Sequence, residues 1–371
     1  MSLLAKLQIG CTHYSLRDCP VPGFSGSDSS PAYSPSNSAL FVGSYDNNIY
    51  KINGTRPFSV LSKNHGSGGE DSPKLHESTN TYVAWGNLRG DTLDCYNMVT
   101  DEMLWQFKPK EKGITTSGVY YDYAFVGTSD SDKGVLYAVD MLSGKEVWSR
   151  QLEGEIWGTL GPGFYSDEVS DVDLVCLGVG GNANPFKDTE SSIQCMDIHT
   201  GVTAWSASVG KQIQSRPSFG KSSLFVGDYN GCMYSFDVHT GAKVWEHCFG
   251  KYLSNVEGSS AVLTLSDGTE YVLVDSFTGY LYALHGSTGD EVWKTKLGNP
   301  HWMGGGAASS VRVVGNKAYV GGPTGVWSVD AETGEVLWKY EVGTQCGSSP
   351  VVYNGIVAIA CEDGYMYLLE A

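Results

Sequence analysis

The stretch GCMYSFDVHTGAKVW, residues 231–245, decides the fold because it encodes a strand, a turn and the start of a second strand. From Tyr234 to Asp237, aromatic and polar residues alternate as they do in a β-strand. The run from Asp237 to Gly241 has the composition of a hairpin turn, with Gly241 suited to the left-handed backbone region. The residues leading to Trp245 then begin the next strand. This stretch therefore predicts two antiparallel strands joined by a tight turn.

The same phrase of glycine, aromatic residue, acidic residue, Thr/Ser-Gly and tryptophan recurs along the whole chain. Clear copies occupy 134–148, 279–293 and 325–338, and weaker copies occupy 48–54, 91–105, 191–205 and 364–370. Units of 40–50 residues that each hold four short strands are typical of propeller blades. Six tryptophans mark the repeat: Trp105, Trp148, Trp205, Trp245, Trp293 and Trp338.

We therefore predict an all-β, eight-bladed β-propeller with four-stranded antiparallel blades, folded as a single domain over residues 1–371. The last unit stops before its outer strand, and residues 4–10 resemble the outer strands at 294–298 and 339–343. We expect the N-terminal strand to complete the last blade, which closes the ring and removes its exposed edges. The expected blades are 25–67, 68–112, 113–154, 155–210, 211–250, 251–298, 299–343, and 344–371 together with 3–10.

The composition agrees with a β fold and excludes several partners. Of 371 residues, 47 are glycine and 22 are tyrosine, and the formal net charge is −17. Glycine disfavours helix interiors, whereas aromatic residues favour strands. A strongly acidic surface repels phosphate, so we expect no nucleic acid partner. No apolar run of about 18 residues occurs, so we expect no membrane span. We also expect a monomer.

The nine cysteines suggest a reducing compartment. Five of them lie inside apolar, strand-like runs, as buried free thiols do. Cys11 and Cys19 could form a local disulfide, and no CxxC pair occurs. Our interpretation is free core thiols, which favours the cytoplasm over a secreted or periplasmic location. The five are Cys95, Cys176, Cys195, Cys232 and Cys361.

The repeat resembles the tryptophan-docking repeat of the quinoprotein alcohol dehydrogenase-like propeller superfamily, and the resemblance covers nearly the whole chain. That superfamily includes dehydrogenases dependent on pyrroloquinoline quinone (PQQ), polyvinyl-alcohol dehydrogenases and non-enzymatic assembly scaffolds of bacterial outer membranes. The resemblance implies that the repeat tryptophans pack between neighbouring blades.

The fourth unit carries the part of the resemblance that concerns the cofactor. Trp157, in Glu-Ile-Trp-Gly-Thr, matches the family's tryptophan that stacks under PQQ, and Asn182 matches its asparagine ligand to Ca²⁺. Asp130 or Asp132 would take the place of the family's glutamate ligand. A flat quinone needs an aromatic platform, and a hard cation needs oxygen ligands.

Other family features are missing from the sequence. The family's catalytic aspartate would fall within residues 211–217, which contain no acid. Asp228-Tyr-Asn occupies the place of a quinone-contacting cation, and adjacent cysteines do not occur. A dehydrogenase without its base and this cation is expected to be slow or inactive.

The loops that enter the inner strands are expected to face the central funnel. Several contain a Ser-Ser-Pro-like phrase, as at 29–31, 215–217 and 348–350. Converging acids there would attract a cation. Trp302 is interpreted as a stacking platform or as packing. The candidate ligand contacts are Asp28, Glu70, Asp71, Thr115, Trp157, Gln214, Arg216, Asn255, Glu257, His301, Trp302 and Gln345.

Two functions follow from the sequence. In the first, the propeller is a binding module that takes a small molecule in its funnel or a protein or peptide on its face. In the second, it is a divergent PQQ- and Ca²⁺-dependent alcohol or polyol dehydrogenase. The residues assigned to a cofactor are Trp157, Asn182, Gln214, Arg216, Glu257 and Trp302, and those assigned to a metal are Asn182, Asp130 and Asp132.

Overall fold

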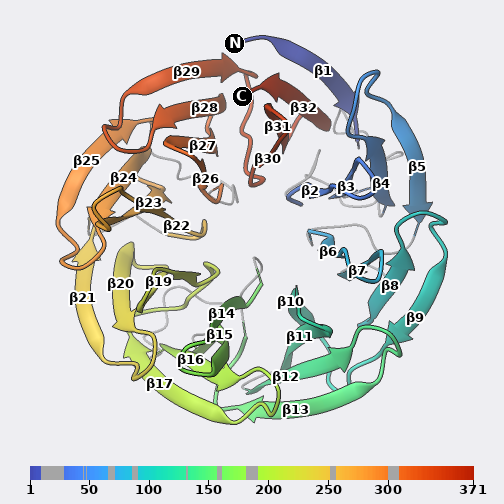
Figure 1. Cartoon of the computed structure of the whole chain (residues 1–371), viewed down its shortest axis with the longest axis vertical. Helices are drawn as coiled ribbons and strands as arrows, with labels where there is room; N and C mark the ends of the chain where they lie inside the picture. The colour runs from blue at the N-terminus through green and yellow to red at the C-terminus, as the bar shows by residue number, and fades with distance from the viewer. Residues whose placement is uncertain are drawn as a thin grey trace.

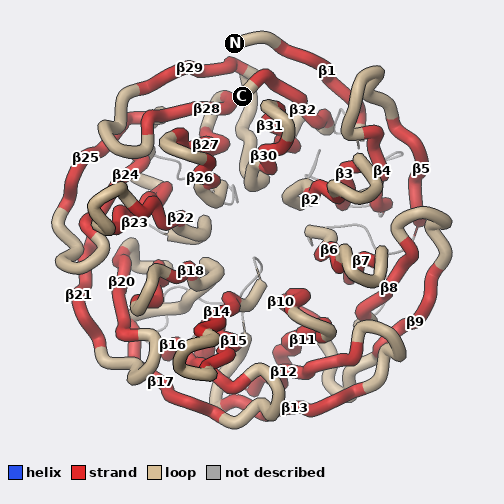
Figure 2. The backbone as a smooth tube through the Cα atoms, in the orientation of Figure 1, coloured by secondary structure: helices blue, strands red, loops and turns tan. Residues whose placement is uncertain are grey.

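The computed structural model of the chain consists of strands and turns, and its described residues contain no helix (Figure 2). The structure describes residues 1–9, 29–44, 46, 48–65, 72–85, 91–130, 133–156, 161–180, 191–250, 256–299 and 309–371, without the side chains of residues 65 and 130. No helix of these residues is long and apolar enough to cross a membrane.

Eight four-stranded antiparallel sheets surround a central axis, each with its first strand innermost and its fourth strand at the rim (Figure 1). The eight-bladed, all-β propeller predicted from the repeat is therefore confirmed. From the channel outwards, the first blade contains β2 (Ala32–Ser34), β3 (Ala39–Ser44), β4 (Asn48–Asn53) and β5 (Val60–His65), and the second contains β6 (Lys74–His76), β7 (Thr81–Trp85), β8 (Leu93–Asn97) and β9 (Met103–Phe107). The third blade contains β10 (Ile114–Tyr120), β11 (Tyr123–Asp130), β12 (Lys133–Asp140) and β13 (Glu146–Leu152). The fourth blade contains β14 (Gly163–Asp167), β15 (Val172–Gly180), β16 (Ser191–Asp197) and β17 (Thr203–Val209).

The remaining blades repeat this order. The fifth blade contains β18 (Ser218–Phe219), β19 (Ser223–Gly227), β20 (Cys232–Asp237) and β21 (Lys243–Cys248), and the sixth contains β22 (Ala261–Thr264), β23 (Glu270–Ser276), β24 (Tyr280–His285) and β25 (Glu291–Lys296). The seventh blade contains β26 (Arg312–Val314), β27 (Lys317–Gly322), β28 (Gly325–Asp330) and β29 (Val336–Glu341). The eighth blade contains β30 (Val351–Tyr353), β31 (Ile356–Ala360) and β32 (Tyr365–Glu370), with β1 (Leu3–Gln8) at the rim.

The ring closes through its two ends, as the sequence predicted. β1 pairs antiparallel with β32, and Leu7 lies opposite Met366. The Ile9 amide adds a hydrogen bond to the Gly364 carbonyl at 2.8 Å. Because the first and last strands share one sheet, the last blade has four strands like the others and the ring is closed.

The repeat phrase forms the turn between the third and fourth strands and the contact with the next blade. In the fifth blade, Asp237 accepts hydrogen bonds from the Thr240 amide and hydroxyl, and Gly241 has a φ of 71°. The Trp245 indole donates to the Gly286 carbonyl of the sixth blade at 2.7 Å. A Cβ on Gly289 would lie 2.7 Å from that indole, so only glycine fits there. Apolar clusters between blades complete the contact.

Three disulfides correct our interpretation of the cysteines as free core thiols. The structure pairs Cys176 with Cys195, Cys232 with Cys248, and Cys346 with Cys361. Cys95 is a buried free thiol, and Cys11 and Cys19 lie outside the described residues. Cys176 and Cys195 sit directly opposite each other on β15 and β16, as do Cys232 and Cys248 on β20 and β21. Strand register, rather than sequence spacing, brought these thiols together.

Candidate functional site

A cavity of about 640 Å³ occupies the central channel. Its wall is formed by residues of the eight innermost strands and by the residues just before several of them. This volume falls within the range of small-molecule sites, roughly 300–1,000 Å³. The channel is therefore the candidate functional site.

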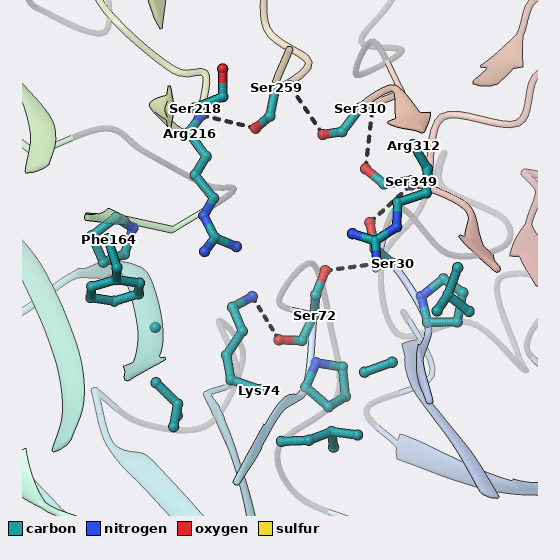
Figure 3. A pocket seen from close by; sticks show the side chains of 18 of the residues that line it. Ser30, Ser72, Lys74, Phe164, Arg216, Ser218, Ser259, Ser310, Arg312 and Ser349 are labelled. Atoms are coloured by element: carbon teal, nitrogen blue, oxygen red, sulfur yellow. Dashed lines mark hydrogen bonds between the residues drawn. The ribbon is translucent and has the colours of Figure 1, made fainter. Parts of the chain in front are cut away.

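A chain of serine hydroxyls links six of the blades around this channel (Figure 3). In each link, a backbone amide of one blade donates to the Oγ of a serine in the next blade. We call this accepting serine the linking serine of its blade. The Ser349 amide, for example, donates to Ser30 Oγ at 2.9 Å, which joins the last blade to the first. The five links run from Arg216 to Ser259, Ser259 to Ser310, Ser310 to Ser349, Ser349 to Ser30 and Ser30 to Ser72.

The first serine of the Ser-Ser-Pro phrase, which comes just before the linking position, forms its hydrogen bond within its own blade. Ser29 Oγ accepts from the Gly43 amide at 2.9 Å, and Ser348 Oγ accepts from the Ala360 amide at 2.9 Å. Ser215 does the same with Gly227 at 3.0 Å. Both serines of the phrase are thus engaged in building the ring, and the phrase itself has a structural role.

Three blades depart from this serine pattern. By strand register, the linking serine is replaced by Thr116 in the third blade, Gly161 in the fourth and Arg216 in the fifth. The Thr116 Oγ1 is buried and has no hydrogen-bond partner. Gly161 has a φ of 97°, and a Cβ there would lie 2.6 Å from the Ser117 carbonyl oxygen. The departures are adjacent to one another and occupy one side of the ring.

Positive side chains project into the channel from three blades. Figure 3 shows Arg216, Arg312 and Lys74 directed from different walls toward the same open space. Lys74 Nζ donates to the Ser72 carbonyl at 2.8 Å, and the Arg216 guanidinium lies 5.8 Å from the Phe164 ring centre. Among the described residues that line the cavity, none is Asp or Glu. The channel wall is therefore cationic in a chain whose net charge is −17.

Arg216 experiences an unfavourable environment for its charge. It is exposed to the channel space, yet the surrounding protein desolvates it. Desolvation and the repulsion from Arg312 lower the pKa of the Arg216 guanidinium. Arginine nevertheless stays charged in proteins. An anion between the two guanidinium groups would relieve both effects.

The structure places few of the predicted site residues. Trp157, Asn182, Trp302 and Asp132 lie outside the described residues, as does the side chain of Asp130. So do Asp28, Glu70, Asp71, Asn255 and His301.

Four further predicted contacts can be placed, and none of them lines the cavity. Gln214 and Gln345 are half-buried in the segments before β18 and β30. Thr115 Oγ1 bonds to the Gly127 carbonyl at 3.5 Å. Glu257 is half-buried beside Tyr229, where burial and this neighbouring carboxylate raise the pKa of the tyrosine. Arg216 alone among the described candidates faces the channel.

Lys74 and Arg312 were missed by sequence reasoning, although a signal for them exists. Each lies two residues after a linking serine, Ser72 or Ser310, and each begins the innermost strand of its blade. They hold the same position in the repeat. A blade-by-blade comparison that began from these serines would have identified both as channel-facing charges.

Among the described residues, no three carboxylate groups lie close together as shared ligands of a metal ion would. The one close group of His, Cys, Asp and Glu ligand atoms in this part of the chain is Cys232, Glu246 and Cys248, and a disulfide joins the two cysteines. Calcium requires six to eight oxygen ligands. No step of a quinone- or calcium-dependent reaction is therefore derived from these residues.

The fold is an eight-bladed propeller, and its repeat resembles the PQQ repeat of the quinoprotein-like superfamily. A family model described as "Outer membrane protein assembly factor BamB" matches residues 89–176 and 277–371. The chain is 26% identical over 244 residues to the outer membrane protein assembly factor BamB of Shewanella oneidensis, covering 64% of this chain and 56% of that protein. It is 22% identical over 236 residues to the polyvinylalcohol dehydrogenase of Sphingopyxis sp. (strain 113P3), covering 56% of this chain and 33% of that protein.

The chain thus spans about half and one third of the lengths of these two curated relatives. Among solved structures, BamB from Moraxella catarrhalis has a similar fold, with a TM-score of 0.69 and 17% sequence identity. That likeness covers 100% of this chain and 99% of the other, and it concerns the fold alone.

Proposed function

We propose that this propeller is a binding module that takes its ligand in the central channel, and that it is not a quinone-dependent dehydrogenase. One observation carries the proposal: the described wall of the cavity has its linking serines engaged in the ring and presents cations without any carboxylate. Dehydrogenation of an alcohol needs a general base near the substrate, and a carboxylate is the usual choice in this superfamily. The described wall supplies ligand-binding charge and no such base.

The fifth blade supports this proposal further. The stretch where the family's catalytic aspartate would fall holds Gln214, Ser215 and Arg216. Ser215 is bonded to Gly227, and Arg216 projects into the channel. A guanidinium at this place cannot remove a proton, because it stays protonated at all physiological pH values.

A divergent PQQ- and Ca²⁺-dependent dehydrogenase is the alternative. The observation in its favour is the 22% identity to a polyvinylalcohol dehydrogenase, together with the match of Trp157 and Asn182 to cofactor-binding positions. If this alternative held, Trp157 would stack on the quinone and Asn182 would ligate the calcium ion. The bound quinone would then accept the electrons of the alcohol.

Turnover separates the two proposals. The full chain is incubated with PQQ and Ca²⁺, and the reduction of an electron-accepting dye is followed with ethanol or polyvinyl alcohol as the substrate. We expect no rate above that of the protein-free mixture. A rate that disappears in Trp157→Ala but persists in Tyr121→Ala would overturn the binding-module proposal. Tyr121 is a suitable control because it is an exposed aromatic residue, 46% accessible, outside the channel lining.

The partner and the compartment are proposals as well. The relative named as an assembly factor supports a protein or peptide bound on the propeller face, in addition to a small molecule in the channel. The sequence favoured the cytoplasm, but three disulfides are typical of oxidising compartments and favour a secreted or periplasmic location instead. Intact mass with and without reductant checks the disulfides directly.

A further inference from the structure

We infer that the central channel binds a small organic anion carrying two or three carboxylate or phosphate groups, held by Arg216, Arg312 and Lys74. This inference rests on the proposed function, because it names the class of ligand that the binding module takes. The charged ends of the three side chains converge on one open space of about 640 Å³ (Figure 3).

The presence of Arg216 and Arg312 in the channel is not explained by salt bridges within the protein. Neither Arg216 nor Arg312 forms an ion pair in the part of the chain that the structure describes, whereas surface lysines such as Lys63 do pair with a carboxylate. Exposed charges on a protein surface need no partner, but like charges that face each other across a narrow channel repel. The two guanidinium groups face the same channel space and the described lining holds no Asp or Glu, so an anion bound between the arginines would offset their repulsion.

Arg216 also occupies a position where the ring would accept serine. Its own amide still donates to Ser259 Oγ at 3.1 Å, so the backbone of the fifth blade follows the pattern of its neighbours. Only the side chain differs, and it points into the cavity instead of bonding to the adjacent blade. The ring gains nothing from a guanidinium here, which is the expected mark of a ligand-binding residue.

The shape and chemistry of the cavity define the ligand further. Guanidinium groups bind carboxylate and phosphate through paired hydrogen bonds, and three positive charges match an anion with two or three negative charges. Between the cations the wall is partly apolar, because Phe164, Phe219 and several prolines line it together with the serines. An organic body that carries the charged groups fits this wall better than a bare inorganic ion, which has no apolar surface to bury.

Isothermal titration calorimetry with citrate tests the inference. The full chain is titrated at constant ionic strength, with chloride replacing citrate in the blank. We expect saturable binding of one citrate per chain, and binding at least tenfold weaker in Arg216→Ser and in Arg312→Ser. Pyrophosphate is titrated in parallel, and the tighter ligand of the two shows whether carboxylate or phosphate is preferred.

Lys145→Ser provides the matched control, since it removes an exposed positive charge from the turn after β12. Its affinity should equal that of the unmodified chain. Arg216→Ser should fold with unchanged or higher stability in the absence of anions, because the substitution removes a repelling charge and restores the residue of the other blades. A weakened affinity in this variant therefore cannot be ascribed to unfolding.

Two results would overturn the inference: no saturable binding of either anion, or equal affinities for the unmodified chain and Arg216→Ser. Either result would leave the binding-module proposal standing, because that proposal fails only through quinone-dependent turnover. Conversely, turnover with PQQ would overturn the proposed function even if citrate bound.

Discussion

The rim and the channel of this propeller are built from the same repeat, yet they differ in what the repeated residue contributes to the ring. At the rim, Trp105, Trp148, Trp205 and Trp245 each donate to a backbone carbonyl of the next blade at 2.7–2.9 Å. At the channel, five blades keep a linking serine, whereas the third, fourth and fifth hold threonine, glycine and arginine.

The difference shows which contacts the ring depends on. Each rim tryptophan fills the space above a turn glycine of the neighbouring blade, as Trp245 does over Gly289, so its loss opens a cavity. A linking serine is only half-buried and accepts one hydrogen bond from the neighbouring blade. We therefore expect the ring to tolerate its loss. Variation is therefore possible at the channel, where a side chain such as Arg216 can serve a ligand.

The largest expected effect is at the rim. Trp245→Ala removes a buried indole, 8% exposed, together with its bond to Gly286. We expect the free energy of unfolding to fall by about 3–5 kcal/mol. Urea denaturation followed by circular dichroism measures this change. Val244→Ala is the control, because Val244 is 50% exposed and should change stability by no more than about 0.5 kcal/mol. Equal losses in the two variants would contradict the role assigned to the rim contact.

A smaller effect is expected where the fourth blade lacks the linking serine. Gly161→Ser restores the residue type of the other blades, but the backbone there has a φ of 97° and a Cβ would meet the Ser117 carbonyl at 2.6 Å. We expect a loss of about 1–3 kcal/mol in the same measurement. Arg216→Ser, at the equivalent position in the next blade, should show no loss. A Gly161→Ser variant as stable as the unmodified chain would mean that the fourth blade can adopt the regular ring geometry.

The smallest expected effect concerns the repeat turns at low pH. The Thr240 hydroxyl, followed by nearby amides, lowers the pKa of Asp237, and the Ser143 hydroxyl does the same for Asp140. A lowered pKa in the folded state contributes stability above the unfolded value, about pH 4, and this contribution is lost as pH falls through the folded pKa.

Asp237→Asn should therefore lose less stability than the unmodified chain between about pH 4 and pH 2, by no more than about 1 kcal/mol because the turn is solvated. Urea midpoints measured across this range test the prediction. An identical pH dependence in both proteins would show that the turn makes no electrostatic contribution.

Much of the architecture could be predicted because it depends on local pattern. The alternation before Asp237, the turn ending at Gly241 and the spacing of the tryptophans are all visible in a single unit. Comparing the chain ends was sufficient to predict that β1 completes the last blade. The candidate site was harder to predict. The Ser-Ser-Pro phrase drew attention to the channel, but its serines are structural, and only Arg216 among the described candidates faces the cavity.

The sequence by itself determined the repeat unit, the number of blades and the closure of the ring, because strand period, turn chemistry and unit length act within some 50 residues. Only the tertiary structure decided which cysteines pair and which charges share the channel. Cys176 meets Cys195 through strand register, and Lys74, Arg216 and Arg312 belong to three blades that are far apart in the sequence. Their proximity is a property of the closed ring, and no local pattern encodes a distance across it.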